Sequence, residues 1–183
     1  MNTSHFLVQT IVGIYTFILV LRAWFQYCQV DFYNPLSQTV VKLTQPILAP
    51  LRKLIPTRNN IDFAALALAF IINTLKYPLL LGSISASLNW GQFALIGVLA
   101  VIKTFGEIIF WAILIRAVMS WFSQGNHPLE YQLYRISEPL LAPIRRILPN
   151  TGMIDFSVMA LAFILILGNN LLLNLFDVLW MLA

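Results

Sequence analysis

The sequence predicts an all-helical membrane protein built from two tandem repeats that run in the same direction. Of its 183 residues, 60% are hydrophobic and only 10% are charged, whereas an ordinary soluble domain carries about a quarter charged residues. Several apolar stretches are long enough for a helix to cross a roughly 30 Å hydrocarbon layer, which takes about 20 residues. The two halves of the chain also match each other in sequence.

The first expected membrane span covers residues 6–27. It begins close to Met1, but no Lys or Arg precedes it, its apolar run exceeds the core of a secretory signal, and no small-x-small cleavage motif follows. We therefore interpret it as a permanent span. The other expected spans are residues 63–81, residues 99–122 within the apolar stretch 93–122, and residues 156–176.

A shift of 93 positions superposes the two halves, and thirteen of the twenty-five residue pairs between 46–70 and 139–163 are identical. Eight of the nine prolines form matched pairs, which are 35 with 128, 46 with 139, 50 with 143 and 56 with 149. We expect repeat 1 over residues 1–82, a connection and the start of the third span over 83–98, and repeat 2 over 99–183. Because each repeat contributes two spans, the repeats are expected to be parallel.

Between the spans of each repeat, a short amphipathic helix is expected. Its apolar positions recur at helical spacing, and they are Leu36, Val40, Leu43 and Ile47 in repeat 1 and Leu129, Leu133, Ile136 and Leu140 in repeat 2. Pro35 and Pro128 suit its first turn, and Pro46 and Pro139 are expected to end the regular helix just before them. Since this helix is too short and too polar to cross, we expect it to lie in the membrane interface.

The basic residues gather on these interfacial segments. The candidate residues for binding lipid or a partner are Lys42, Arg52, Lys53, Arg135, Arg145 and Arg146. The connection between the repeats, residues 82–91, carries no charge, so the positive-inside rule places the basic segments in the cytoplasm and both termini on the outer side of the membrane. Anionic lipids attract such clusters by about 1 kcal/mol per basic residue.

The expected partners are therefore anionic membrane lipids at the cytoplasmic face, together with a membrane-protein partner or a second copy of the chain. Nucleic acid is not expected, because prolines and aliphatic residues separate the basic positions.

Two arginines lie inside apolar stretches, Arg22 in repeat 1 and Arg116 in repeat 2. One interpretation is that each side chain snorkels to the aqueous interface. The other is that each pairs with an aspartate at the start of the next span, Asp62 or Asp155, although these aspartates also suit a helix N-cap. Because both arginines recur at the same place in the repeats, we expect a structural role.

A few polar residues near the opposite ends of the spans could line a path for an ion or osmolyte. The candidates are Lys76, Glu107, Asn170 and Asp177. Against this interpretation, they lie near helix ends, Lys103 can pair with Glu107 four residues on, and amides often join helices within membranes.

No catalytic, cofactor-binding or metal-binding residue is expected. Cys28 is the single cysteine, and the two histidines, His5 and His127, do not share a helix face. The sequence contains no glycine-rich phosphate loop and no nucleophile elbow. These observations favour a protein without its own catalysis.

The repeated motifs resemble those of the YggT family of bacterial membrane proteins in its duplicated form. They are an Arg-Ala pair near the end of the first span, "QPILAPLRKLIP" and "EPLLAPIRRILP" at 45–56 and 138–149, and Ile-Asp-Phe at 61–63 and 154–156. The motif positions carried over as a repeat-motif surface are Pro50, Arg52, Pro56 and Asp62 in repeat 1 and Pro143, Arg145, Pro149 and Asp155 in repeat 2.

The resemblance implies a multi-pass protein of the bacterial inner membrane, and with the orientation expected above both termini then lie in the periplasm. Plastid and cyanobacterial relatives are linked to haem attachment on a b-type cytochrome and to nucleoid distribution, and bacterial ones to envelope, division or osmotic-stress phenotypes. The family supplies no established catalytic residue. Haem chemistry on this chain is not expected, because the ligands and thiols for it are missing.

Overall fold

The fold is all-helical in the parts of the chain that the structure, a computed structural model, describes: residues 3–31, 34–58, 60–81, 89–122, 128–148 and 156–183. The helices are α1 (Thr3–Tyr27), α2 (Pro35–Leu54), α3 (Phe63–Leu81), α4 (Trp90–Phe122), α5 (Pro128–Ile147), α6 (Phe156–Phe176) and the short α7 (Val178–Leu182). The order of a long apolar helix, an amphipathic helix and a second apolar helix therefore occurs twice.

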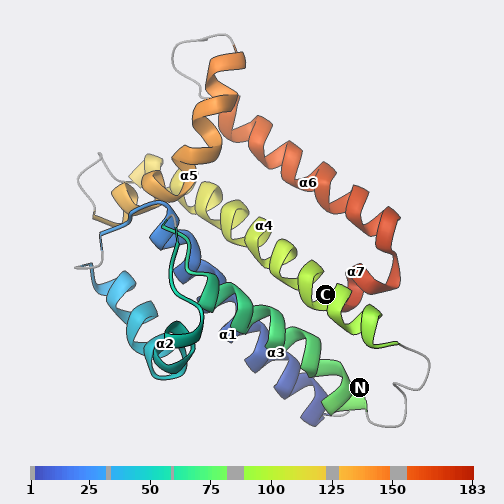
Figure 1. The fold of residues 1–183 in the computed structure, drawn as a ribbon. Helices are drawn as coiled ribbons and strands as arrows, with labels where there is room; N and C mark the ends of the chain where they lie inside the picture. The colour runs from blue at the N-terminus through green and yellow to red at the C-terminus, as the bar shows by residue number, and fades with distance from the viewer. Residues whose placement is uncertain (1–2, 32–33, 59, 82–88, 123–127, 149–155) are drawn as a thin grey trace.

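The four long apolar helices run in two directions (Figure 1). Helices α1 and α4 run one way, and α3 and α6 run back. Helices α2 and α5 lie at the end of the molecule opposite the two chain termini. This arrangement places the two basic segments at one end, as parallel repeats require.

Three of the helices are long and apolar enough to cross a membrane, namely His5–Tyr27 in α1, Trp90–Ser120 in α4 and Phe156–Phe176 in α6. In α3 the apolar stretch, Phe63–Pro78, is shorter. Much of the surface of α6 is apolar and exposed, as at Met159, Phe163 and Leu171, and a large exposed apolar surface marks contact with lipid or protein. The chain thus has the helices of a membrane protein.

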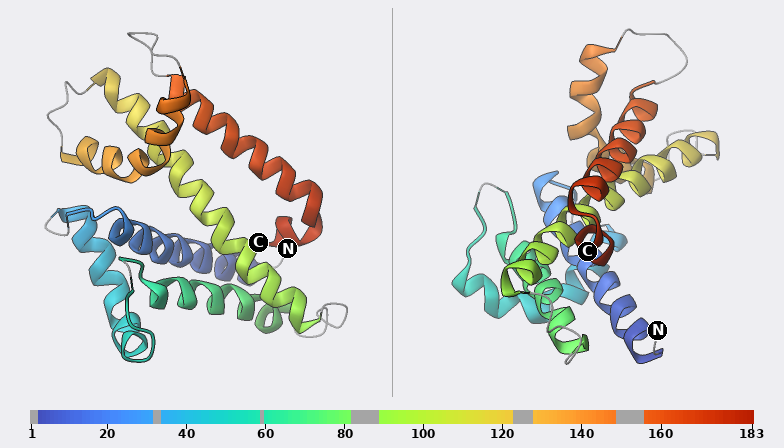
Figure 2. Two further views of the ribbon diagram at one scale, coloured as in Figure 1. Left: turned by 45° about the horizontal axis from the view of Figure 1, so that its top comes forward. Right: turned by 90° about the vertical axis from the view of Figure 1, so that its right-hand side faces the viewer.

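The prolines within the amphipathic helices do not end them, so the prediction that the regular helix stops before Pro46 and Pro139 was wrong. Helix α2 continues through Pro46 and Pro50, and α5 through Pro139 and Pro143. A proline inside a helix removes a backbone hydrogen bond and bends the axis, and Figure 2 shows α5 changing direction part-way along. Buried Leu48 and Leu141 follow the first proline of each pair, so packing holds the second half helical.

Pro35 was correctly expected at the first turn of its helix. It follows the N-cap residue Asn34, whose side chain accepts a hydrogen bond from the backbone N–H of Leu36 at 3.2 Å. In the same way, α5 begins at Pro128.

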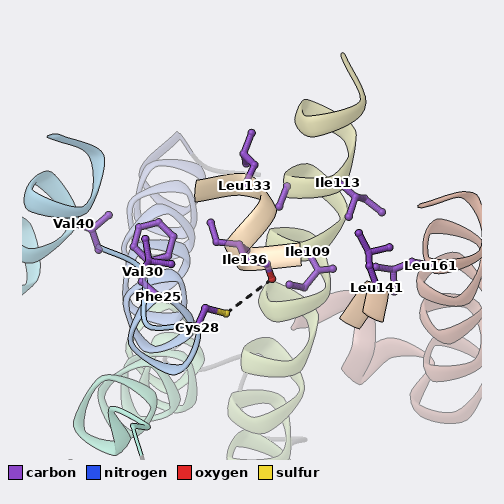
Figure 3. Close-up of a cluster of buried hydrophobic side chains, with 11 residues drawn as sticks. Phe25, Cys28, Val30, Val40, Ile109, Ile113, Leu133, Ile136, Leu141 and Leu161 are labelled. Carbon is purple, nitrogen blue, oxygen red and sulfur yellow. Dashed lines mark hydrogen bonds between the residues drawn. The ribbon is translucent and has the colours of Figure 1, made fainter. Parts of the chain in front are cut away.

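One cluster of buried apolar side chains joins the two repeats (Figure 3). Phe25 and Cys28 at the end of α1 meet Ile109 of α4 and Ile136 of α5. The indole N–H of Trp24 donates a hydrogen bond to the carbonyl of Ile136 at 3.1 Å. Cys28 lies just after the last residue of α1, and its side chain is buried in this cluster.

A second buried cluster holds α1, α3 and α4 together, and Leu48 of α2 also belongs to it. Helices α3 and α4 approach each other closely at Gly97 of α4. A Cβ atom at Gly97 would lie 2.2 Å from the hydroxyl of Thr74 and 3.0 Å from the carbonyl oxygen of Phe70. The lack of a side chain at Gly97 therefore permits α3 and α4 to pack this closely.

Candidate functional site

The first candidate site is a buried arginine in α1. The side chain of Arg22 is only 4% exposed, and its Nε lies 3.5 Å from a carboxylate oxygen of Asp62. Its guanidinium also donates to the hydroxyl of Thr44 and, at 2.8 Å, to the side-chain carbonyl of Gln45, both in α2. A buried cation needs this degree of pairing, because its desolvation is costly. Of the two interpretations of Arg22, the structure supports pairing, because the side chain is buried among its partners.

Asp62 connects three elements. Its side chain is fully buried, it accepts a charge-assisted hydrogen bond from Arg52 at the end of α2, and it lies beside Arg22 of α1. Its other carboxylate oxygen accepts from the backbone N–H of Ala65 at 3.2 Å, in the first turn of α3. Asp62 is therefore both the partner of the arginines and the N-cap that the sequence suggested. We call Arg22, Thr44, Gln45, Arg52 and Asp62 the first arginine cluster.

Repeat 2 holds a similar arrangement, the second arginine cluster, formed by Arg116, Ser137, Glu138 and Arg145. Arg116 donates to the hydroxyl of Ser137 at 2.8 Å and lies 4.0 Å from the carboxylate of Glu138. Arg145 donates to the same carboxylate at 3.1 Å. Glu138 thus joins the two arginines of repeat 2.

The two clusters use corresponding positions but different anions. Ser137 and Glu138 correspond to Thr44 and Gln45 under the shift of 93 residues. In repeat 1 the carboxylate that joins the arginines comes from Asp62, whereas the described part of repeat 2 supplies it from Glu138. Asp155, which corresponds to Asp62, lies outside the described residues, as does Pro149.

Sequence reasoning missed Thr44, Gln45, Ser137 and Glu138 as arginine partners. The signal was available, because the 93-residue shift pairs a hydroxyl with a hydroxyl and an amide with a carboxylate at these positions. It does not identify the partners by itself, because the contacts of α2 with α1 and of α5 with α4 depend on packing between segments that are distant in the sequence.

The six basic candidates divide into two groups. Arg52 and Arg145 are partly buried in intramolecular ion pairs, and Arg135 donates at 3.3 Å to the carbonyl of Gln29 across the repeats. The remaining candidates, Lys42, Lys53 and Arg146, are exposed. The first group makes contacts within the fold, and the second group faces the surroundings.

The motif prolines lie on the surface of the amphipathic segments. Pro50 and Pro143 are exposed within α2 and α5, and Pro56 is exposed just after α2.

The residues proposed for a polar path are only partly brought together. Lys76 and Glu107 line one cavity of about 400 Å³ between α1, α3 and α4, which Asn73 and Lys103 also line. Asn170 and Asp177 are exposed and are not among its lining residues. Lys103 donates at 3.2 Å to the carbonyl of Trp180, and within the described residues no ion pair joins it to Glu107.

The described residues form no cluster of the side chains that usually hold a metal ion. No group of three or more His, Cys, Asp or Glu side chains comes together in them. Burial of the Cys28 thiol raises its pKa to about 12, and a buried, protonated thiol is a poor nucleophile.

Comparisons with known proteins agree with the repeat. The profile of the family described as CCB3/YggT matches residues 1–83 and again 95–176. An uncharacterized protein of Haemophilus influenzae is 46% identical over 183 residues, which cover 100% of this chain and 98% of that protein. The uncharacterized protein YggT of Escherichia coli K12 is 46% identical over 92% of this chain and 88% of its own length.

A more distant relative, the uncharacterized protein PA0392 of Pseudomonas aeruginosa, is 36% identical over 86% of this chain and 82% of its own length. The comparison with solved structures gave no match. The family profile covers most of the chain in two segments, and the matched relatives span nearly the same length. The chain therefore belongs to the CCB3/YggT family.

Proposed function

We propose that this protein is a non-enzymatic scaffold or assembly factor of the bacterial inner membrane, serving envelope maintenance, division, osmotic-stress response or assembly of a membrane complex. In this proposal α1, α3, α4 and α6 are four membrane spans. Helices α2 and α5 lie on the cytoplasmic surface, where they bind anionic lipid and present a surface to a membrane partner or to a second copy of the chain.

The observation that carries the proposal is the repeated pairing of an internally held arginine with an exposed basic neighbour. Arg52 and Arg145 are fixed by buried or partly buried carboxylates, and the next residue in each helix, Lys53 or Arg146, is exposed. Each exposed cation in such a place contributes about 1 kcal/mol of attraction to an anionic leaflet. The fold thus holds two such cations at the same end of the molecule.

The length of α3 supports its role as the fourth span. Its 19 residues correspond to about 28 Å of helix at about 1.5 Å per residue, close to the roughly 30 Å of the hydrocarbon layer. Helix α3 runs antiparallel to α1 and α4, and it packs against both of them through the second buried cluster. This packing along two membrane-long helices supports α3 as the fourth span.

The proposal is tested by reversing only the exposed charges, Lys53→Glu with Arg146→Glu. Arg52 and Arg145 are left unchanged, because their loss would break ion pairs and confuse binding with folding. The matched control keeps the charges and changes the side chains, Lys53→Arg with Arg146→Lys. We expect the reversed variant, and not the control, to lose its preference for anionic over zwitterionic lipid in nanodiscs and its recovery of cross-linked partners from native membranes. If the charge-reversed variant inserts normally and keeps its lipid preference and partner recovery unchanged, the proposal is rejected.

The cavity lined by Lys76 and Glu107 supports a second candidate function, transport of an ion or osmolyte. Its walls combine two lysines with a carboxylate and with buried Asn73, whose amide donates to the hydroxyl of Thr16 at 2.8 Å, and ionisable groups within spans are usually functional. Liposomes containing the full chain, compared with a Glu107→Gln variant, provide the test. Flux of potassium, protons or small osmolytes that the variant loses supports transport, and no flux beside a working control transporter rejects it.

A further inference from the structure

A basic cavity lies between α1 and α2, beside the first arginine cluster. Its volume is about 520 Å³, and it is lined by Arg22, Gln26, Gln38, Val41, Lys42, Gln45 and Arg52. The lining contains three cations and three glutamines but no carboxylate. Such a set of guanidinium, ammonium and amide groups is suited to phosphate oxygens, which arginine binds through several N–H donors at once.

The two arginines of this cavity are held in place by ion pairs and hydrogen bonds within the protein. Arg22 is buried and hydrogen-bonded to Gln45, and Asp62, which pairs with Arg22 and Arg52, is not itself part of the lining. Asp62 therefore pairs with two of the three cations of the lining, and its single negative charge leaves the lining with an excess of positive charge. The ion pairs with Asp62 preorganise the two arginines, which reduces the entropy that binding would cost.

Repeat 2 has the same arrangement of arginines but carries a carboxylate at the position that corresponds to Gln45. There Glu138 replaces Gln45, and its carboxylate lies within 4.0 Å of Arg116 and 3.1 Å of Arg145. Tyr134 stands at the position of Val41, and the guanidinium of Arg116 lies 4.9 Å from the centre of its ring. The cavity of repeat 1 thus has a neutral amide where repeat 2 has a built-in anion.

We propose that the cavity beside the first arginine cluster binds the phosphate group of an anionic lipid headgroup, and that repeat 2 does not share this activity. The proposal rests on the proposed function, in which this end of the molecule lies at the cytoplasmic leaflet, and it adds a defined site to the general attraction of the basic surface. Arg22 lies five residues before the end of α1, about 8 Å along the helix, a depth that a headgroup phosphate at the interface can approach.

The test compares two variants of the full chain that change the net charge equally. Gln45→Glu adds a carboxylate to the cavity, as repeat 2 has it, whereas Lys53→Gln removes one exposed charge outside the cavity. Binding of phosphatidylglycerol is measured by native mass spectrometry and by titration into nanodiscs, with phosphatidylcholine as the reference lipid. Glycerol phosphate and inorganic phosphate are added as soluble competitors in a separate arm.

We expect Gln45→Glu to weaken phosphatidylglycerol binding at least about tenfold more than Lys53→Gln. In native mass spectrometry, the Gln45→Glu variant should retain one bound lipid fewer than the wild-type chain. The exposed-residue variant Lys42→Gln, which removes a cation of the lining, should act in the same direction if Gln45→Glu fails to fold. If soluble phosphates compete at concentrations similar to those of the lipid, the ligand is a free phosphate compound. That result supports the phosphate site and shows that its ligand does not come from a lipid headgroup.

Two results would overturn the inference. Equal weakening by Gln45→Glu and Lys53→Gln would show that only the general basic surface attracts lipid, and the proposed function would survive without the site. A wild-type chain that does not prefer phosphatidylglycerol to phosphatidylcholine, and binds neither soluble phosphate, would reject the site and the lipid-binding part of the proposed function together.

Discussion

The substitution Asp62→Asn should reveal the energetic cost of leaving Arg22 buried without its anion. Asparagine keeps the size of the side chain and can still cap α3, so the change removes mainly the charge. The side chain of Asp62 is fully buried and that of Arg22 is 4% exposed, and breaking such a buried pair costs about 3–5 kcal/mol. Arg52, whose side chain is 29% exposed, can turn to water and adds little to this cost.

The matched control is Glu138→Gln in the second arginine cluster. The side chains of Glu138, Arg116 and Arg145 are all between 20% and 32% exposed, and ion pairs with access to solvent contribute about 0–1 kcal/mol. The assay is reversible unfolding of the full chain in mixed micelles by titration with sodium dodecyl sulfate. If Asp62→Asn lowers the free energy of unfolding no more than Glu138→Gln, the reasoning on buried pairing is refuted. Adding Arg22→Gln to Asp62→Asn should recover part of the loss, because it removes the stranded cation.

Three further predictions concern packing. Gly97→Val should lower the free energy of unfolding by about 1–3 kcal/mol, because a Cβ there would lie 2.2 Å from the Thr74 hydroxyl; Gly91→Val, where nothing lies within 4 Å, should leave the same titration unchanged. Cys28, whose pKa burial raises to about 12, should react with maleimide at pH 8 only after denaturation, and rapid labelling of the folded chain would contradict its burial. Asn73→Leu should cost about 1 kcal/mol through loss of its hydrogen bond to Thr16, and a double-mutant cycle with Thr16→Val that shows no coupling would rule that bond out.

The apolar helices could be predicted from the sequence because length and hydrophobicity are properties of one segment at a time. The expected span 156–176 coincides with α6, and the span 63–81 coincides with α3 as a helix. The apolar stretch of α3 is shorter than those of α1, α4 and α6. The assignment of α3 as a membrane span therefore depends also on its packing against the neighbouring helices. The pairing of Arg22 with Asp62 could be raised as one of two interpretations because both residues recur in the repeats.

The remaining features depend on packing between segments that are distant in the sequence. The preference of prolines to end helices is a local tendency, and burial of Leu48 in contact with α1 and α3 outweighs it in α2. The carboxylate of Glu138 could not be assigned to Arg116, 22 residues earlier in the chain, without the course of α5. The basic cavity likewise requires that residues of α1 and α2, distant in the sequence, line the same space.

The most direct test of the central claim, that the two basic helices lie at the cytoplasmic surface, is thiol labelling from each side of the membrane. The full chain would carry Cys28→Ala together with Lys53→Cys, Arg146→Cys or Trp90→Cys, each at an exposed residue. The account predicts that a membrane-impermeant maleimide labels Trp90→Cys in intact spheroplasts, and labels Lys53→Cys and Arg146→Cys only in inverted vesicles. Labelling of Lys53→Cys or Arg146→Cys in intact spheroplasts would contradict it.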